Sequence, residues 1–272
     1  MEHLTVNECI AAASTIGNNV ILAKNRDRPY KPEIQVIRKM VDGVEVALFH
    51  DVTTGWVEGI NEFGIGLINT ALMVGHDEKE KQLVQKSGKK SNDGPRVTAT
   101  LGQKTLKDAV KMAVTFDGGI KGHTFIANRK AGFVIENTSK HKYDIKDMDM
   151  ENVTVRTNHG HTYPDAGYTE GIKYLSSKIR KISAEKEISQ VNHYHDIARA
   201  MREPLYQQNS MLNMARDTEE MFTSSQIVLN LNTLEMMVYL FESKIEKFHG
   251  LKSELPEGYT PKIKIKAFLV NR

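Results

Sequence analysis

Cysteine occurs once in this 272-residue chain, at position 9. Its thiolate would be a strong nucleophile, able to attack a carbonyl carbon and form a thioester. A lone cysteine is more often a small buried side chain with no chemical role. The residues that fold around Cys9 therefore decide between the two interpretations.

A charged run, Lys24-Asn25-Arg26-Asp27-Arg28-Pro29, follows within twenty residues of Cys9. The turn signal Gly17-Asn18-Asn19 predicts a hairpin that pairs residues 9–14 with residues 20–24. Cross-strand partners lie within side-chain reach, so we expect Asp27 or Lys24 to approach the Cys9 nitrogen. The alternative is a solvated turn that ends the strand.

Four features occur in a characteristic order: Cys9, Asn25-Arg26-Asp27, the glycine-rich residues 59–66, and Thr157-Asn158-His159. This order resembles the cysteine N-terminal-nucleophile (Ntn) hydrolases. They include choloylglycine hydrolases, penicillin V acylases and acyl-CoA:6-aminopenicillanic acid acyltransferases. Residues 24–29 are also similar to secernins and their dipeptidase relatives. The resemblance covers residues 9–160 and continues more weakly to the end.

The resemblance implies an α+β fold, a four-layer αββα sandwich of two antiparallel sheets. It also implies that residues 1–8 are a leader, removed autocatalytically between Glu8 and Cys9, and that residues 9–272 form a single domain. The freed α-amine of Cys9 would serve as its own general base. The thiolate would attack a linear amide, and water would hydrolyse the resulting thioester.

The resemblance also assigns roles to individual residues. Asp27 would orient the Cys9 amine, and Asn158 would help to bind the oxyanion. Lys24 or Arg26 stands where relatives carry an arginine, although lysine does not reproduce arginine geometry. Further substrate or oxyanion candidates are Asn69, which falls near a family pocket position, His159, and one late arginine, either Arg202 or Arg216.

Hydrophobic periodicity predicts strands, a helix, strands, helices and strands in that order. Strands are expected within residues 9–71, at 124–128, 132–137 and 153–157, in a hairpin of 225–231 with 234–241, and in the alternating residues 262–267. An exposed loop or lid is expected at 77–96, and a helix starts after the capping pair Thr105 and Asp108. Residues 169–214 are expected to be helical, with Ile172, Leu175, Ile179 and Ile182 as the apolar stripe.

The composition limits the classes of molecule that the protein is expected to bind. A net charge of +3 gives no support to nucleic-acid binding, and no apolar stretch is long enough to span a membrane. The ten histidines lack metal-ligand spacing, so we expect no metal and no cofactor. A single cysteine excludes an intrachain disulfide and favours a reducing, cytoplasmic location. The expected partner is a small acyl-amide substrate, and relatives are often homo-oligomers.

The sequence thus predicts an acylase-type hydrolase of linear, non-peptide C–N amide bonds. Acyl transfer or dipeptidase activity on the same scaffold is an alternative, suggested by residues 24–29. A non-catalytic binding protein that keeps its first eight residues is the alternative from another class.

Overall fold

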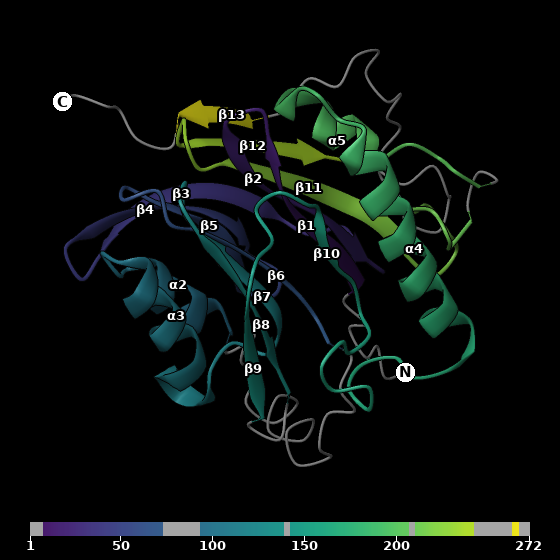
Figure 1. Cartoon of the computed structure of the whole chain (residues 1–272), viewed down its shortest axis with the longest axis horizontal. Coiled ribbons are helices and arrows are strands. Elements are labelled where there is room, and N and C mark those ends of the chain that lie inside the picture. The colour runs from purple at the N-terminus through teal and green to yellow at the C-terminus, as the bar shows by residue number, and fades with distance from the viewer. Residues whose placement is uncertain (1–7, 73–92, 139–141, 207–209, 242–262, 267–272) are drawn as a thin grey trace.

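The computed structural model describes residues 8–72, 93–138, 142–206, 210–241 and 263–266. Two antiparallel sheets stack on each other, with helices on both outer faces (Figure 1). One sheet has the strand order β10-β1-β2-β11-β12-β13, and the other has the order β3-β4-β5-β6-β7-β8-β9. The expected four-layer αββα sandwich is confirmed.

The strands and helices follow one another in the expected order. The six-stranded sheet contains β1 (Glu8–Ile16), β2 (Asn19–Arg28), β10 (Thr154–Arg156), β11 (Phe222–Asn230), β12 (Glu235–Leu240) and β13 (Ile263–Lys266). The seven-stranded sheet contains β3 (Ile34–Val41), β4 (Val44–Asp51), β5 (Trp56–Asn61), β6 (Gly66–Thr70), β7 (Gly122–Ala127), β8 (Gly132–Asn137) and β9 (Tyr143–Asp147). The helices are α2 (Asp93–Leu101), α3 (Leu106–Thr115), α4 (Gly171–Ser189) and α5 (Ile197–Ala200), with short 3-10 turns η1 (Phe116–Gly118) and η2 (Tyr194–Asp196).

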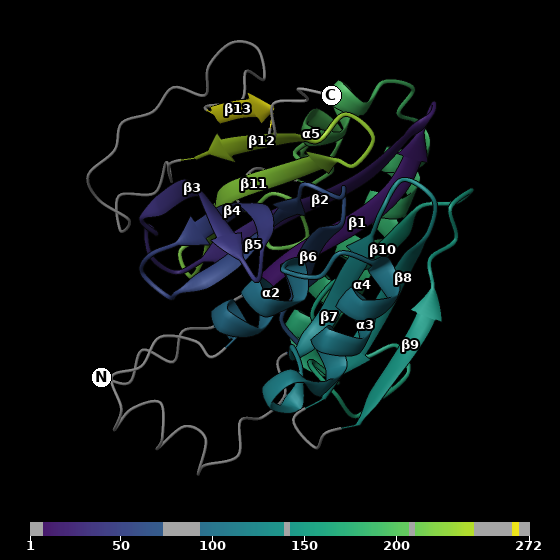
Figure 2. The same cartoon turned by 90° about the vertical axis from the view of Figure 1, so that its left-hand side faces the viewer.

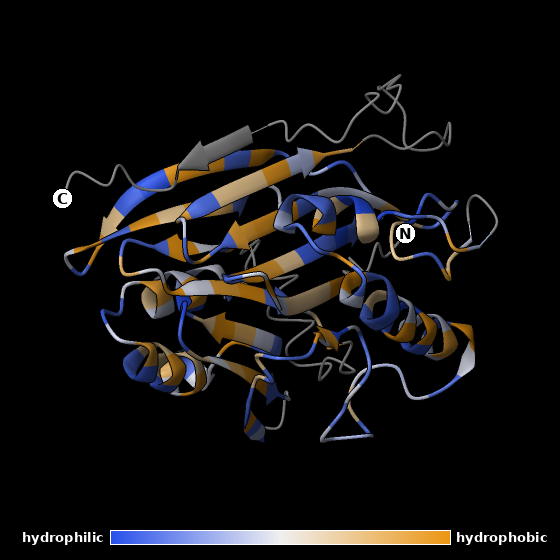
Figure 3. Cartoon of the chain, turned by 45° about the horizontal axis from the view of Figure 1, so that its top comes forward, coloured by the Kyte–Doolittle hydropathy of each residue, from blue (hydrophilic) through white to orange (hydrophobic). Residues whose placement is uncertain are grey.

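Three hydrophobic clusters hold the four layers together. One lies between the sheets and includes Leu22, Phe49 and Phe125. The second joins the six-stranded sheet to α4 and α5, and the third joins the seven-stranded sheet to α2 and α3. Figure 2 shows the sheets from the side, and Figure 3 shows the hydrophobic segments that run along their strands. Among the described residues, no helix is long and apolar enough to cross a membrane.

The hairpin of β1 and β2 positions the charged run. Gly17 turns the chain at a φ of +60°, which glycine adopts without strain, and Cys9 pairs with Arg26 across the hairpin. Strand β2 continues through Arg28, four residues further than the sequence predicts. The residues of the run that lie in β2 are at most 2% exposed, so the alternative of a solvated turn is wrong.

The helices on the seven-stranded sheet include one that the sequence did not predict. Thr105 caps α3 as expected, since its Oγ1 accepts from the Asp108 N–H at 3.1 Å. Helix α2 begins at Asp93, so the loop predicted for residues 77–96 is wrong over its last four residues, and residues 77–92 lie outside the described part. A Cβ on Gly94 would lie 2.0 Å from the Gly55 carbonyl oxygen, so glycine serves close packing there rather than a loop.

The predicted apolar stripe of α4 faces outward. Ile172, Leu175 and Ile182 are 55%, 48% and 61% exposed, and Ile179 is half-buried. The buried face carries small and polar side chains instead: Ser176, Ser177, Arg180, Ser183 and Ala184, followed by Ile188. The stripe prediction is wrong because the first part of α4 meets polar groups, such as the Asn158 N–H and the Asp27 carboxylate. Only its second part packs on the apolar surface of the six-stranded sheet. The helical prediction for residues 169–214 holds only for α4, η2 and α5.

Lysine substitutions on opposite faces of α4 test its orientation. We expect Ile182→Lys to change the free energy of unfolding by no more than about 0.5 kcal/mol, as exposed substitutions do. Ala184→Lys should cost more than about 2 kcal/mol, because it forces a charge into a packed interface. Urea unfolding of both variants measures the difference. A larger loss for Ile182→Lys than for Ala184→Lys would contradict the observed orientation.

Candidate active site

Strand alternation divides the polar residues at the start of β1 between two faces. Ala11 and Leu22 belong to the core between the sheets, so Cys9, Arg26 and Arg28, which share their faces by strand alternation, also face the second sheet. Glu8 and Asp27, which pair across the hairpin, face the helix layer. The thiol and the Asp27 carboxylate therefore lie on opposite sides of the same sheet.

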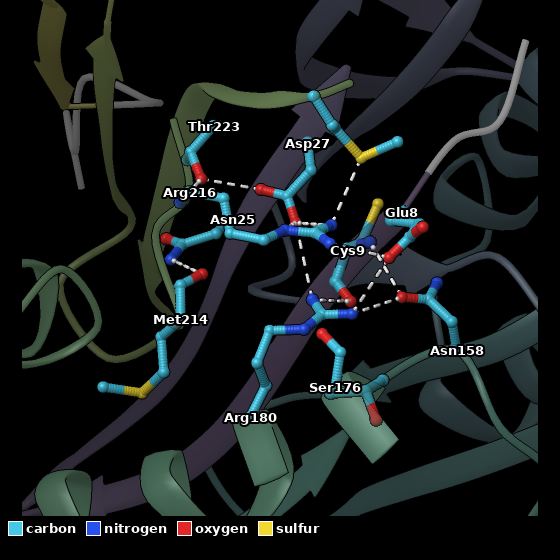
Figure 4. A network of polar contacts seen from close by, with 12 residues as sticks. Glu8, Cys9, Asn25, Asp27, Asn158, Ser176, Arg180, Met214, Arg216 and Thr223 are labelled. Atoms are coloured by element: carbon cyan, nitrogen blue, oxygen red, sulfur yellow. Dashed lines mark hydrogen bonds and ion pairs between the residues drawn. The ribbon is translucent and has the colours of Figure 1, made fainter. Parts of the chain in front are cut away.

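Side chains from distant parts of the chain hold the peptide bond between Glu8 and Cys9. The Cys9 N–H donates to Asn158 Oδ1 at 3.2 Å, and Arg28 Nη1 donates to the Glu8 carbonyl oxygen at 3.4 Å. The same Arg28 nitrogen lies 3.8 Å from Cys9 Sγ. Arg180 Nη1 donates to the Cys9 carbonyl at 3.3 Å (Figure 4). Both sides of this peptide and the adjacent thiol thus contact buried polar groups.

Asp27 anchors the arginines beside this peptide. Its carboxylate accepts from Thr223 Oγ1 at 2.7 Å, from Arg216 Nε at 3.1 Å and from Arg180 Nη1 at 3.4 Å. Arg180 also donates to Asn158 Oδ1 at 3.1 Å, the atom that accepts from the Cys9 N–H. Asp27 therefore reaches the Cys9 nitrogen through Arg180 and Asn158, where the sequence predicts a direct approach.

The two late arginine candidates lie in different places. Arg216 bonds to Asp27 and Glu8, whereas Arg202 stacks over the Phe241 ring at 3.3 Å. Burial by itself lowers the pKa of Arg216, but Asp27 and Glu8 raise it well above its ordinary value. Burial and the charge of Arg216 lower the pKa of Arg180 to about 10. Both guanidinium groups are therefore charged at neutral pH.

Lys24 and Arg26 form buried ion pairs on the face between the sheets. Lys24 contacts Glu58 of β5, and Arg26 Nη2 lies 2.9 Å from Asp51 of β4. Arg26 Nη1 also lies 3.5 Å from Glu58, and Arg28 Nε lies 3.9 Å from Asp51. Burial lowers the pKa of Lys24, against the opposing attraction of Cys9 and Glu58. The sequence predicts substrate contacts for Lys24 and Arg26, and the structure places both in this ion-pair cluster.

The cluster holds three cations, Lys24, Arg26 and Arg28, against the two carboxylates of Asp51 and Glu58. Burial by itself lowers the pKa of Arg28, but Cys9, Tyr30 and Asp51 raise it above its ordinary value. Arg28 Nη1 brings this cluster, with its excess of cations, within 3.8 Å of Cys9 Sγ.

Asn69 and His159 contact other parts of the site. The Asn69 side chain donates to the Lys121 carbonyl at 3.0 Å and to Thr124 Oγ1 at 2.8 Å, while its backbone N–H donates to Glu58 Oε1 at 3.1 Å. The His159 ring lies 2.8 Å from Ser177 Oγ of α4 and stacks on His161. Asn69 thus supports the ion-pair cluster through its backbone, and His159 packs against helix α4.

The loop that follows β10 is shaped by one carboxylate. Glu136 of β8 accepts backbone N–H groups of His161, Thr162 and Tyr163 at 2.9–3.2 Å.

Asn158 is held by two further hydrogen bonds. Ser177 Oγ accepts the Asn158 N–H at 2.9 Å, and Asn158 Nδ2 donates to the Ala71 carbonyl at 2.8 Å. These bonds fix the orientation in which Asn158 Oδ1 faces Cys9.

Comparison with solved structures identifies this architecture. The chain superposes on a Caenorhabditis elegans ortholog of N-acylethanolamine-hydrolyzing acid amidase with a TM-score of 0.59 and 12% identity, covering 82% of this chain and 93% of that one. A conjugated bile acid hydrolase from Clostridium perfringens matches with a TM-score of 0.56 and 11% identity, covering 87% and 90%. This chain has the Ntn-hydrolase fold. No family model matches the sequence, and no curated protein matches it either.

Four residues of this candidate site were missed by sequence reasoning: Glu8, Arg28, Tyr168 and Arg180. Arg28 had a signal, because it lies two and four residues after Arg26 and Lys24 and so shares their strand face. Arg180 had no such signal, since the predicted apolar stripe of α4 assigned its position to the solvent side.

In the described part of the chain, no group of histidine, cysteine or acidic side chains is arranged to hold a metal.

Three neighbouring histidines make stability depend on pH. Burial lowers the pKa of His123 to about 3, of His159 to about 4 and of His161 to about 2, against an ordinary value of 6.5. Their folded-state values are depressed, so the unfolded chain binds more protons below pH 6.5. We expect stability to be full above about pH 6.5 and to fall progressively below it, as measured by urea unfolding from pH 8 to pH 5.

His123→Gln serves as the matched variant for this pH series. It should show a shallower decline below pH 6.5, because one fewer group takes up a proton on unfolding. A decline that starts only below pH 4.5 would assign acid sensitivity to carboxylates such as Glu8, whose pKa the neighbouring arginines lower despite burial.

Proposed function

We propose that the protein is an amidohydrolase that uses Cys9 as its nucleophile after the peptide bond between Glu8 and Cys9 is cleaved. The observation that carries this proposal is the way that peptide bond is held. Asn158 accepts its N–H, and Arg28 donates both to its carbonyl oxygen and to the adjacent thiol. Most peptide bonds inside a sheet are hydrogen-bonded by the backbone of a neighbouring strand. This one is also bonded by the side chains of Asn158 and Arg28, which could stabilise the nitrogen and the carbonyl oxygen during acyl transfer.

The cleavage step follows from these contacts. Cys9 Sγ attacks the Glu8 carbonyl carbon, and a C–S bond forms as the C–N bond breaks. The thiol proton passes to the leaving nitrogen, which becomes the α-amine of Cys9. Arg28 stabilises the charge that develops on the carbonyl oxygen. Water then hydrolyses the thioester, which frees the main-chain α-carboxylate of Glu8 and regenerates the thiol.

Turnover of an external amide repeats the same chemistry. The freed α-amine takes the proton of the Cys9 thiol, and the thiolate attacks the substrate carbonyl. The amine part of the substrate leaves with that proton, and water hydrolyses the thioester. Asn158 Oδ1, which accepts the Cys9 N–H in the structure, keeps the α-amine oriented. Asp27 keeps Arg180 in contact with Asn158.

The fold comparisons support a linear amide as the substrate. An N-acylethanolamine-hydrolyzing acid amidase and a conjugated bile acid hydrolase, as their names state, act on N-acylethanolamines and conjugated bile acids. The first name describes an amidase that hydrolyses an N-acyl compound, and the second describes a hydrolase of a conjugate. We therefore assign this protein to acylase-type hydrolysis of a non-peptide C–N bond. Dipeptidase and acyl-transfer activities have no observation of their own here.

Intact mass and activity of Cys9 variants test this assignment. We expect the purified wild-type protein to begin at Cys9 and to release amine from a panel of acyl amides. Cys9→Ala should keep its N-terminal segment and lose all activity, with its melting temperature nearly unchanged. Cys9→Ser should cleave more slowly, because a hydroxyl is a weaker nucleophile than a thiol.

Two results would contradict the assignment. Cleavage before residue 9 in Cys9→Ala would show that another protease removes the segment. A wild-type protein that retains the segment, and whose Cys9 resists iodoacetamide, would favour the non-catalytic binding protein.

Arg28 and Arg26 form a matched pair for the role of the carbonyl donor. Both are buried on one face of β2, but the bonds to Glu8 and Cys9 come from Arg28. Arg28→Gln should slow cleavage and turnover by about 100-fold or more, in the range of a lost oxyanion donor. Arg26→Gln should cause a similar loss of stability with a smaller kinetic loss. Equal kinetic losses in single-turnover assays would assign both arginines a structural role only.

A further inference from the structure

The Glu8 side chain lies in a cradle that is built for a carboxylate. Arg216 Nη1 lies 2.9 Å and Arg180 Nη2 lies 3.2 Å from Glu8 Oε2, and the Tyr168 hydroxyl donates to Oε1 at 2.8 Å (Figure 4 shows the two arginines). Glu8 is 2% exposed, Arg180 is fully buried and Arg216 is 5% exposed. Two guanidinium groups and one hydroxyl therefore enclose one carboxylate out of contact with solvent.

The charges in this cradle balance only while Glu8 is present. Arg180 and Arg216 face the carboxylates of Glu8 and Asp27, two cations against two anions. Removal of Glu8 would leave both guanidinium groups with Asp27 alone, beside the new α-amine of Cys9. Buried cations without a counter-ion are unfavourable, so the emptied cradle would keep an affinity for one anion.

The chemistry of cleavage connects this cradle to the acyl group of a substrate. Attack on the Glu8 carbonyl gives a thioester on Cys9 Sγ, the same kind of intermediate that a substrate gives. In that thioester Glu8 is the acyl group. Before the attack, its carbonyl oxygen accepts a hydrogen bond from Arg28. A substrate carbonyl that reaches the same thiol and the same donor places its own substituent where the Glu8 side chain lies.

We propose that the mature site hydrolyses amides whose acyl group carries a carboxylate at the place of the Glu8 side chain, α-glutamyl amides being the simplest. Arg180, Arg216 and Tyr168 would bind that carboxylate. This inference rests on the proposed function of Cys9. It defines the acyl half of the substrate and leaves the amine half free to vary.

A pair of isosteric probes tests the inference on the processed wild-type protein. N-acetyl-α-glutamyl 4-nitroanilide and N-acetylglutaminyl 4-nitroanilide differ only by the replacement of a carboxylate oxygen with an amide nitrogen. We expect kcat/KM for the glutamyl probe to exceed that for the glutaminyl probe by about 100-fold, since two charge-assisted bonds are lost with the amide. Equal rates for both probes, or a preference for the glutaminyl probe, would overturn the inference.

Tyr168→Phe tests whether the cradle is the source of the preference. Loss of one neutral donor should reduce the ratio of the two kcat/KM values by about fivefold to tenfold. Tyr163→Phe, a change in the same loop away from Glu8, should leave the ratio unchanged. An unchanged ratio in Tyr168→Phe would overturn the role assigned to the cradle, and this variant keeps both buried arginines and so avoids the most disruptive substitutions.

Acylation by 4-nitrophenyl acetate separates failure of this inference from failure of the proposed function. If Cys9 is acylated and turned over by the ester, but neither anilide is hydrolysed, the proposed nucleophile stands and the inference falls. If Cys9 is not acylated by the ester and neither anilide is hydrolysed, the proposed function fails and the inference fails with it.

Discussion

Burial of five consecutive polar residues in strand β2 is the constraint on which the rest of the site depends. Residues 24–28 lie in the middle of the six-stranded sheet and are at most 2% exposed. An unpaired buried charge costs several kcal/mol, so each charged side chain needs a partner from another layer. The face between the sheets receives Asp51 and Glu58, and the helix face receives Arg180 and Arg216. The run therefore joins both sheets and the outer helix α4 at one point.

That point is the start of β1, where both charge networks meet a single peptide bond. The network between the sheets reaches the Cys9 thiol through Arg28, and the network on the helix side reaches the Cys9 nitrogen through Asn158. Arg28 also crosses to the carbonyl oxygens of Glu8 and Asp27. Arg28 thus contacts both the thiol and the Glu8 carbonyl, while Asn158 holds the Cys9 nitrogen from the helix side.

Helix α4 shows what this polar interior demands of its surroundings. Its buried face uses serines, whose small size brings the helix close to the sheet and whose hydroxyls bond to backbone groups of neighbouring segments. Ser177 accepts from the Asn158 N–H, and Ser176 donates to the Met211 carbonyl at 2.6 Å. Large apolar side chains would leave the Asn158 N–H and the Met211 carbonyl without these partners. The helix consequently carries its larger apolar residues on the outer face, against the usual amphipathic pattern.

Much of the fold was predictable because the signals are local. The β1–β2 hairpin, the Thr105 cap of α3 and the β11–β12 hairpin each depend on residues close in sequence, and all three were predicted. The order of Cys9, residues 25–27, residues 59–66 and residues 157–159 likewise predicted the fold, and the structure confirms it. Strand β5 lies within the region predicted to form strands, but the sequence did not predict it as a separate strand. The exposed strand β9 was not predicted because its residues, Tyr143–Asp147, lack a clear apolar face.

The sequence by itself therefore determined the order of the elements, and it predicted Cys9, Asp27 and Asn158 as candidates for chemistry. Only the tertiary structure decided which layer covers each face: that residues 24–28 are buried, that Arg216 and not Arg202 meets Asp27, and that α4 turns Arg180 inward. The physical reason is that periodicity shows which side chains share a face, over spacings of two or 3.6 residues. The partners that neutralise a buried charge come from segments as far apart as Asp27 and Arg216, and no local pattern specifies that pairing.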